Sequence, residues 1–110
     1  MEKESEVIIM KKIISGRLYD TDTAKSLGSY WNGCGAGDFN YLCEELYQKK
    51  TGEYFLCGTG GALSKYRKFV ANGSVGSTEI IPYTEEEARA WAEKYLEADE
   101  YIQLFGNVAE

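Results

Sequence analysis

The sequence feature that most constrains the fold is a capped, amphipathic helix near the C-terminus. Thr84 is followed three residues later by Glu87, the capping-box pattern that starts a helix. Glutamates in the first turn also favour the positive end of the helix dipole. Apolar residues then recur at helical spacing, at Ala88, Trp91, Ala92, Tyr95 and Leu96. The pattern predicts a helix with one apolar side, which needs a packing partner.

A small antiparallel sheet is the predicted partner. Residues 42–48 and 53–57 are β-prone and flank the turn Lys49-Lys50-Thr51-Gly52, so they are predicted to form a hairpin. Since the chain has 110 residues, we expect one domain covering residues 1–110. The fold class is therefore predicted to be α+β, with a central hairpin and the acidic C-terminal helix packed on one face of the sheet.

The other segments are assigned from strand-forming, capping and turn residues. A short helix is predicted over residues 23–27, because Asp20 and Asp22 supply caps and Gly28 ends it. Asp99 is predicted to cap a second short helix that buries Ile102 and Phe105 and ends at Gly106. The remaining predictions are a flexible N-terminus (1–6), a buried strand (7–14), strands at 17–19 and 79–81 (the latter ended by Pro82), loops at 32–38 and 72–77, a turn at 58–61 and a helical turn within 62–69.

The absence of histidine narrows the possible chemistry. Histidine is the commonest general base and a frequent zinc ligand, so Ser–His and Cys–His catalysis are excluded and a zinc site is disfavoured. The three cysteines, Cys34, Cys43 and Cys57, lack C-x-x-C spacing. Cys43 and Cys57 flank the hairpin and are predicted to lie nearly opposite each other as reduced thiols. We expect no catalytic residues, no metal site and no cofactor.

Charge is distributed unevenly along the chain. The net charge is −6, but residues 1–78 hold ten basic and nine acidic residues, whereas residues 79–110 hold two basic and nine acidic ones. Such an acidic segment repels a phosphate backbone and attracts a basic surface, so direct DNA binding is not expected. Glu86, Glu93 and Glu97 are predicted to project from the outer face of the helix. They are candidate partner-binding residues, together with Asp99 and Glu100.

Three other groups of residues are candidate sites. The glycines of residues 33–37 and 58–61 match no complete nucleotide-binding pattern. Lys65, Tyr66 and Arg67, next to Lys68 and Phe69, form a basic-aromatic cluster that is a second candidate for partner binding. The carboxylates of a hypothetical divalent metal site are Asp20 and Asp22, with Asp38 or Glu44 and Glu45.

The expected location is the bacterial cytoplasm. No apolar run approaches the roughly 20 residues of a membrane-spanning helix. The first six residues are too acidic for a signal peptide. We therefore expect no membrane partner.

Several segments together resemble a family of small type II-A anti-CRISPR-like proteins from mobile elements of Gram-positive bacteria. The segments are residues 19–24, residues 45–56 continued by 58–61, residues 80–88, Trp91, and the closing Phe105-Gly106. The resemblance implies an inhibitor of the RNA-guided nuclease of that system, since some members are thought to interfere with guide-RNA loading. It implies no catalytic residues.

Three functions follow as hypotheses. The first is a non-enzymatic inhibitor that binds a type II CRISPR RNA-guided DNA nuclease, with or without its guide RNA, and interferes with guide loading or nucleic-acid binding. The second is a generic protein-interaction module of a mobile element, in which the acidic helix is only a solvated face. The third is a small metal-dependent ribonuclease that uses the carboxylates named above.

Overall fold

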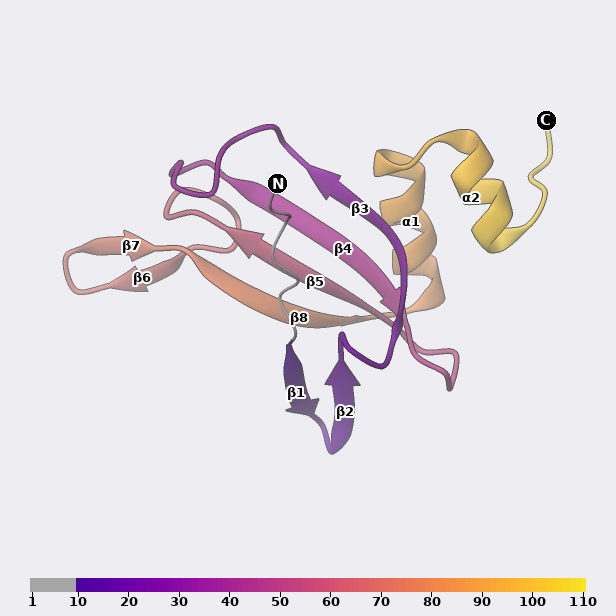
Figure 1. The fold of residues 1–110 in the computed structure, drawn as a ribbon, viewed down its shortest axis with the longest axis horizontal. Coiled ribbons are helices and arrows are strands. Elements are labelled where there is room, and N and C mark those ends of the chain that lie inside the picture. Colours follow the sequence, from indigo (N-terminus) through magenta and orange to yellow (C-terminus); the bar gives the residue numbers. More distant parts are fainter. Residues whose placement is uncertain (1–9) are drawn as a thin grey trace, which may run out of the picture.

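Four antiparallel strands form the centre of the molecule in this computed structural model, which describes residues 10–110 (Figure 1). They are β3 (Lys25–Trp31), β4 (Leu42–Gln48), β5 (Tyr54–Gly60) and β8 (Ser77–Tyr83). The strands lie in the order β3-β4-β5-β8, so only β8 returns to the sheet after a longer excursion. The sheet therefore has two edges, β3 and β8.

Two small hairpins are separate from this sheet. The first consists of β1 (Lys11–Ile14) and β2 (Arg17–Asp20), and the second of β6 (Lys68–Val70) and β7 (Gly73–Val75). Each pairs only within itself. The β1–β2 hairpin contributes Tyr19 to the core, whereas the β6–β7 hairpin projects from one end of the long axis (Figure 1).

Two helices follow β8, namely α1 (Glu85–Tyr95) and α2 (Ala98–Phe105). The capping box predicted for α1 is confirmed. The Glu87 amide donates to Thr84 Oγ1 at 3.1 Å, and the Thr84 amide donates to Glu87 Oε1 at 2.8 Å. These bonds satisfy two backbone donors that the helix itself leaves unpaired.

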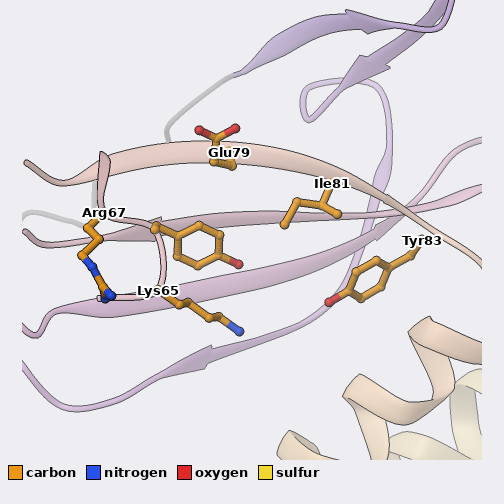
Figure 2. Close-up of a pocket in the computed structure, with 6 residues that line it drawn as sticks. Lys65, Arg67, Glu79, Ile81 and Tyr83 are labelled. Atoms are coloured by element: carbon orange, nitrogen blue, oxygen red, sulfur yellow. The ribbon is translucent and has the colours of Figure 1, made fainter. Parts of the chain in front are cut away.

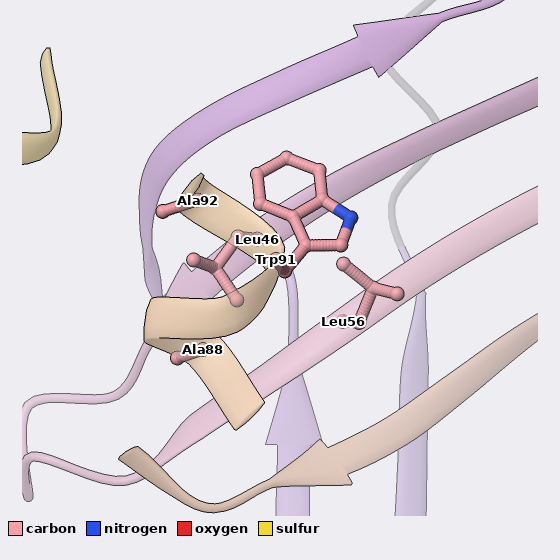
Figure 3. Packing of buried hydrophobic residues seen from close by; sticks show 5 residues of the cluster. All are labelled: Leu46, Leu56, Ala88, Trp91 and Ala92. Carbon is pink, nitrogen blue, oxygen red and sulfur yellow. The ribbon is translucent and has the colours of Figure 1, made fainter. Parts of the chain in front are cut away.

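The main core lies between α1 and one face of the sheet (Figure 3). Leu46 of β4 and Leu56 of β5 are cross-strand neighbours, so their side chains point to the same face. Trp91 of α1 packs against both, and it is only 5% exposed. Ala88 and Ala92 flank it, and their small side chains let the helix approach the sheet closely.

A second core lies on the opposite face of the sheet. Tyr47 and Phe55 are again cross-strand neighbours, and their rings stack with centroids 5.1 Å apart. Tyr19 meets Phe55 edge-on at 5.5 Å, a favourable arrangement for two aromatic rings. Ile80 completes the cluster. The sheet is thus covered by a helix on one face and by a hairpin on the other.

The predicted fold class is confirmed. The molecule is α+β, its central hairpin pairs Gln48 with Tyr54 across the predicted turn, and the acidic helix α1 packs on one face. One difference is that β5 continues through Gly60, so the turn predicted at residues 58–61 is wrong.

The helix predicted over residues 23–27 is also wrong, because β3 begins at Lys25. The capping side chains are used in a turn instead. Asp20 Oδ1 accepts a hydrogen bond from the Asp22 amide, and the Ala24 amide bonds to the Asp20 carbonyl. Pairing with β4 then outweighs the weak helical preference of so short a segment.

Pro82 does not end the last strand, which runs to Tyr83. β8 is an edge strand, so one side of its backbone has no ladder partner and proline is tolerated there. The loop predicted at residues 72–77 instead contains β7 and the start of β8. The helical turn predicted within residues 62–69 is replaced by two tight turns, closed by Ser64 and Arg67 amides, and by β6.

The second helix exists but is packed differently from the prediction. Its N-cap is Glu97 rather than Asp99, and Gly106 ends it as expected. None of its residues is buried, and Ile102 is 40% exposed. Phe105 is half-buried, with its ring centroid 6.1 Å from that of Tyr54.

The remaining corrections concern the N-terminal strand and the cysteines. The flexible segment 1–6 and residues 7–9 of the predicted strand lie outside the described residues. The described part of that strand, β1, is mostly exposed rather than buried. Cys43 pairs with Thr59 and Cys57 pairs with Glu45, so the two thiols are offset along the hairpin rather than opposite.

Candidate functional site

A fully buried carboxylate organises the helix-covered side of the sheet. Glu44 of β4 is 0% exposed, and all its side-chain partners come from other segments. Trp91 Nε1 of α1 donates to Oε1 at 3.0 Å. Lys65 Nζ lies 2.6 Å from Oε2, which also accepts a hydrogen bond from the Tyr66 hydroxyl. Glu44 therefore joins the sheet, the helix and the 62–67 loop.

The electrostatics of this cluster are set by burial and by the three donors. Burial opposes ionisation of the Glu44 carboxyl, but the hydrogen bonds from Lys65, Tyr66 and Trp91 outweigh it and hold its pKa below the ordinary value. Burial and the adjacent Glu44 carboxylate raise the pKa of Tyr66. The cluster is therefore an ionised carboxylate held by a lysine, a neutral phenol and an indole.

Glycines in β5 make room for the loop that carries Lys65 and Tyr66. A Cβ atom at Gly58 would lie 2.0 Å from the Tyr66 ring, and one at Gly60 would lie 2.0 Å from Ser64 Oγ. Both side chains therefore rest directly on the strand backbone, as close approach to a glycine permits. This packing explains why glycine occupies positions 58 and 60.

A shallow groove lies beside the cluster (Figure 2). We call it the Lys65 groove. Lys65 and Arg67 contribute from the loop, and Glu79, Ile81 and Tyr83 contribute from β8. Its volume is about 360 Å³. Burial and Glu44 raise the pKa of Tyr83, so this phenol is neutral at physiological pH.

The structure separates the three residues of the basic-aromatic candidate. Tyr66 is buried, at 5% exposure, so its ring belongs to the core of the cluster, although it also lines the Lys65 groove. Lys65 is half-exposed but paired with Glu44. Arg67 is exposed and donates from Nη1 to the Ser64 carbonyl at 3.1 Å. Only Lys65 and Arg67 therefore present charge to a partner.

The acidic candidate residues are all exposed. We call this set the acidic surface, and it consists of Glu86, Glu93, Glu97, Asp99 and Glu100. Glu86, Glu93 and Glu97 do not share one helix face as predicted, because α1 ends at Tyr95 and Leu96 caps it in an extended conformation. Glu86 and Glu93 lie on α1, whereas the other three members of the acidic surface lie at the start of α2.

Part of the acidic surface also has a structural role. Glu100 Oε1 accepts a hydrogen bond from the Glu97 amide at 3.0 Å, which caps α2. Within residues 10–110, neither Glu86 nor Glu93 makes a side-chain hydrogen bond or an ion pair. These two can therefore meet a partner without the loss of a side-chain contact within the described residues.

The carboxylates of the hypothetical metal site are not brought together. Glu44 and Glu45 point to opposite faces of β4, as expected from strand alternation, and Glu45 bonds to Ser26 instead. Asp20 is buried at the end of β2, 4.0 Å from Lys11 Nζ. In the part of the chain that the structure describes, no three histidine, cysteine or acidic side chains are grouped as metal ligands would be.

Sequence reasoning missed the role of Glu44 as the centre of a buried cluster. The signal was present in the strand pattern, because Glu44 occupies the same phase of β4 as the apolar Leu46. A charged residue at such a position requires buried donors. Nothing in the sequence showed that Trp91 and Tyr66, 47 and 22 residues away, would supply them.

Comparisons of the chain with protein-family models, with curated proteins and with solved structures give no match. Neither helix among residues 10–110 has the length and apolar character that crossing a bilayer requires. Geometry and charge are therefore the basis for assigning a function.

Proposed function

We propose that this protein is a non-enzymatic inhibitor of a type II CRISPR RNA-guided nuclease and acts in the cytoplasm of the bacterial host. The acidic surface is proposed to bind the nuclease protein. The observation that carries the proposal is the charge of the two helices: residues 85–100 hold seven acidic and two basic side chains, and every residue of the acidic surface is exposed. The sequence resemblance described above supports the choice of target.

Charge complementarity provides the physical basis for this binding. RNA-guided nucleases hold guide and target in a positively charged channel. A folded acidic surface competes for that channel by attraction over several ångströms and by occupying its volume. Such obstruction requires no reacting group on the inhibitor.

The state of the buried cluster is consistent with a non-enzymatic role. Both oxygens of Glu44 are engaged by donors from the protein itself. A general base needs a carboxylate that reaches substrate, and Glu44 is fully buried. The cluster is best explained as the structure that holds the loop and the helix on the sheet.

An order-of-addition assay tests the proposal. DNA cleavage by the nuclease is measured with the protein added before or after the guide RNA. Inhibition only when the protein is added first indicates that it blocks guide loading, which is the expected result. Inhibition in either order indicates a later step and also supports the proposal. Full cleavage in both orders, with folded protein in excess, contradicts it.

Charge reversal tests which surface is used. The double variant Glu86→Lys/Glu93→Lys is expected to stay folded, because exposed substitutions change stability by less than about 0.5 kcal/mol each and the helix dipole adds a similar cost near the N-terminus. Its inhibition is expected to weaken, mainly through slower association.

Asp22→Lys is the matched control. Asp22 is exposed, and its side chain accepts no hydrogen bond from the residues that the structure describes. Asp22→Lys replaces an acidic side chain with a basic one, as each substitution in the double variant does. It does so outside the acidic surface. Equal inhibition by wild type and the double variant would show that the acidic surface is not the binding site.

A further inference from the structure

The β6–β7 hairpin presents an aromatic ring to solvent. Phe69 is 78% exposed, the highest value among the large apolar side chains of residues 10–110. The hairpin is fixed to the body of the molecule by two serine hydroxyls. Ser74 Oγ donates to the Ala62 carbonyl at 2.5 Å, and Ser77 Oγ donates to the Tyr66 carbonyl at 2.5 Å. The ring is therefore held on an anchored arm and takes no part in either core.

One cation lies against this ring, and others lie near the base of the hairpin. The Arg67 guanidinium carbon lies 5.3 Å from the Phe69 ring centroid, and Lys68 is adjacent in the strand. Lys68 and Lys12 share one carboxylate, that of Glu79, at 3.4 and 3.7 Å. Two of these cations share one carboxylate, and the Arg67 guanidinium has no carboxylate partner within residues 10–110, so the base of the hairpin carries an excess of positive charge.

The acidic surface lies far from the hairpin. The molecule extends 49 Å along its longest axis, and the helices and the β6–β7 hairpin lie towards opposite ends of it (Figure 1). The Debye length at physiological ionic strength is about 8 Å. A ligand at the hairpin therefore responds to the local positive charge and not to the net charge of the whole chain.

We infer that the β6–β7 hairpin is a contact site for single-stranded RNA, with Phe69 stacking on one base and Arg67 and Lys68 facing the adjacent phosphates. An exposed aromatic ring next to cations is the recurring element of single-strand recognition. Bases in a duplex are already stacked and paired, so they cannot cover the ring in this way. The inference rests on the proposed function, in which the single-stranded part of the guide RNA is the RNA within reach.

Fluorescence anisotropy with a labelled, unpaired oligoribonucleotide of about 16 nucleotides tests the inference without any nuclease. Wild-type protein is expected to bind it at low salt and to bind a duplex of the same length more weakly. Phe69→Ala is expected to weaken binding roughly 5- to 150-fold, which corresponds to the loss of one stacked base. Phe69→Leu should weaken RNA binding similarly, because leucine keeps apolar area but has no ring. Phe69→Trp should retain RNA binding, because tryptophan keeps an aromatic ring.

Two further variants identify the contacts. Arg67→Ala is expected to lower the slope of log affinity against log salt by about 0.7, as for one lost phosphate contact. Phe39→Ala is the control, because Phe39 is also an exposed aromatic residue, at 65%, but lies outside the hairpin. It should bind RNA like wild type.

The inference is overturned if wild type does not bind the oligoribonucleotide, if Phe69→Ala binds as well as wild type, or if duplex binds equally. It is also overturned if Phe69→Ala weakens binding only to the guide-free nuclease, since the hairpin would then be a protein contact. Failure of the proposed function is detected separately, in the cleavage assay with Glu86→Lys/Glu93→Lys.

Discussion

Glu44 shows how a single charged residue can be retained inside a small core. Each oxygen of its carboxylate accepts at least one hydrogen bond, and Lys65 supplies the compensating charge at the rim. A buried charge without such partners would be strongly destabilising. The cluster is therefore sensitive to the removal of any one donor.

Tyr66→Phe is expected to reduce the free energy of unfolding by about 1–3 kcal/mol, because it leaves a buried carboxylate oxygen with one donor fewer. Chemical denaturation measures this directly. Tyr30→Phe serves as a control, since Tyr30 is half-buried and its hydroxyl makes no hydrogen bond within residues 10–110. A loss of equal size in both variants would mean that the Glu44 contact is not the cause.

The depressed pKa of Glu44 makes part of the stability depend on pH. The folded-state pKa lies below the unfolded value of about 4.3, so the native state favours the ionised form. This contribution is present above the unfolded pKa and is lost as pH falls through the folded pKa. The stability difference between wild type and Glu44→Gln should therefore be constant near neutral pH and should shrink below about pH 4. A difference that stays constant down to strongly acidic pH would contradict this.

At the scale of elements, β5 and the 62–67 loop act as one packed unit. In Gly58→Ala the new methyl group would lie 2.0 Å from the Tyr66 ring, so the loop must move. We expect a loss of about 1–3 kcal/mol, as for other overpacked sites. Gly35→Ala is the matched control, because nothing lies within 4 Å of its Cβ position. In a Tyr66→Ala background, Gly58→Ala should cost much less, and an unchanged cost in thermal unfolding would refute the contact.

The two tryptophans provide a comparison of buried and exposed positions. Trp91→Ala removes the side chain that attaches α1 to the sheet and should cost about 3–5 kcal/mol. Trp31 is 59% exposed at the end of β3, so Trp31→Ala should cost less than about 1 kcal/mol. Denaturation midpoints of the two variants check this. Similar midpoints would show that α1 is not held by Trp91.

Elements with local signals could be predicted from the sequence. Helix α1 has a capping box and an apolar stripe within a few turns, and the β4–β5 hairpin has a turn between two β-prone runs. Strand β3 could not be predicted in this way. The capping residues Asp20 and Asp22 before this segment and Gly28 within it favour a helix locally. Only pairing with β4 makes the segment a strand. Tertiary contacts override weak local preferences in such segments.

For the candidate site too, features with a local sequence signal could be predicted and features that depend on tertiary contacts could not. Exposed acidic residues are visible in the sequence as charge, so the members of the acidic surface could be predicted, although the break at Tyr95 that divides them between two helices could not. Burial of Tyr66 could not be predicted because it depends on Gly58, eight positions earlier on a neighbouring strand. The exposure of Phe69 could not be predicted either, because it depends on how the β6–β7 hairpin projects from the molecule.

At the scale of the whole molecule, charge is separated along the long axis. The helices are acidic, whereas the β6–β7 hairpin, which carries Lys68, lies towards the other end (Figure 1). If the acidic surface contacts the nuclease, the association rate should fall as salt rises from about 0.1 to 0.5 M, because steering of exposed charges is screened. Stopped-flow or surface-based kinetics measure this rate. A rate indifferent to salt would rule out electrostatic steering by the acidic surface.

The packing of Tyr66 on Gly58 and its bond to Glu44 also restricts how this chain can change over generations. A larger residue at position 58 displaces the ring, and loss of the ring leaves the carboxylate short of a donor. Trp91 is linked to the same carboxylate. The effects of substitutions at these four positions are therefore coupled. A distant descendant that has kept this architecture should show correlated replacement at all four, long after its exposed residues have diverged.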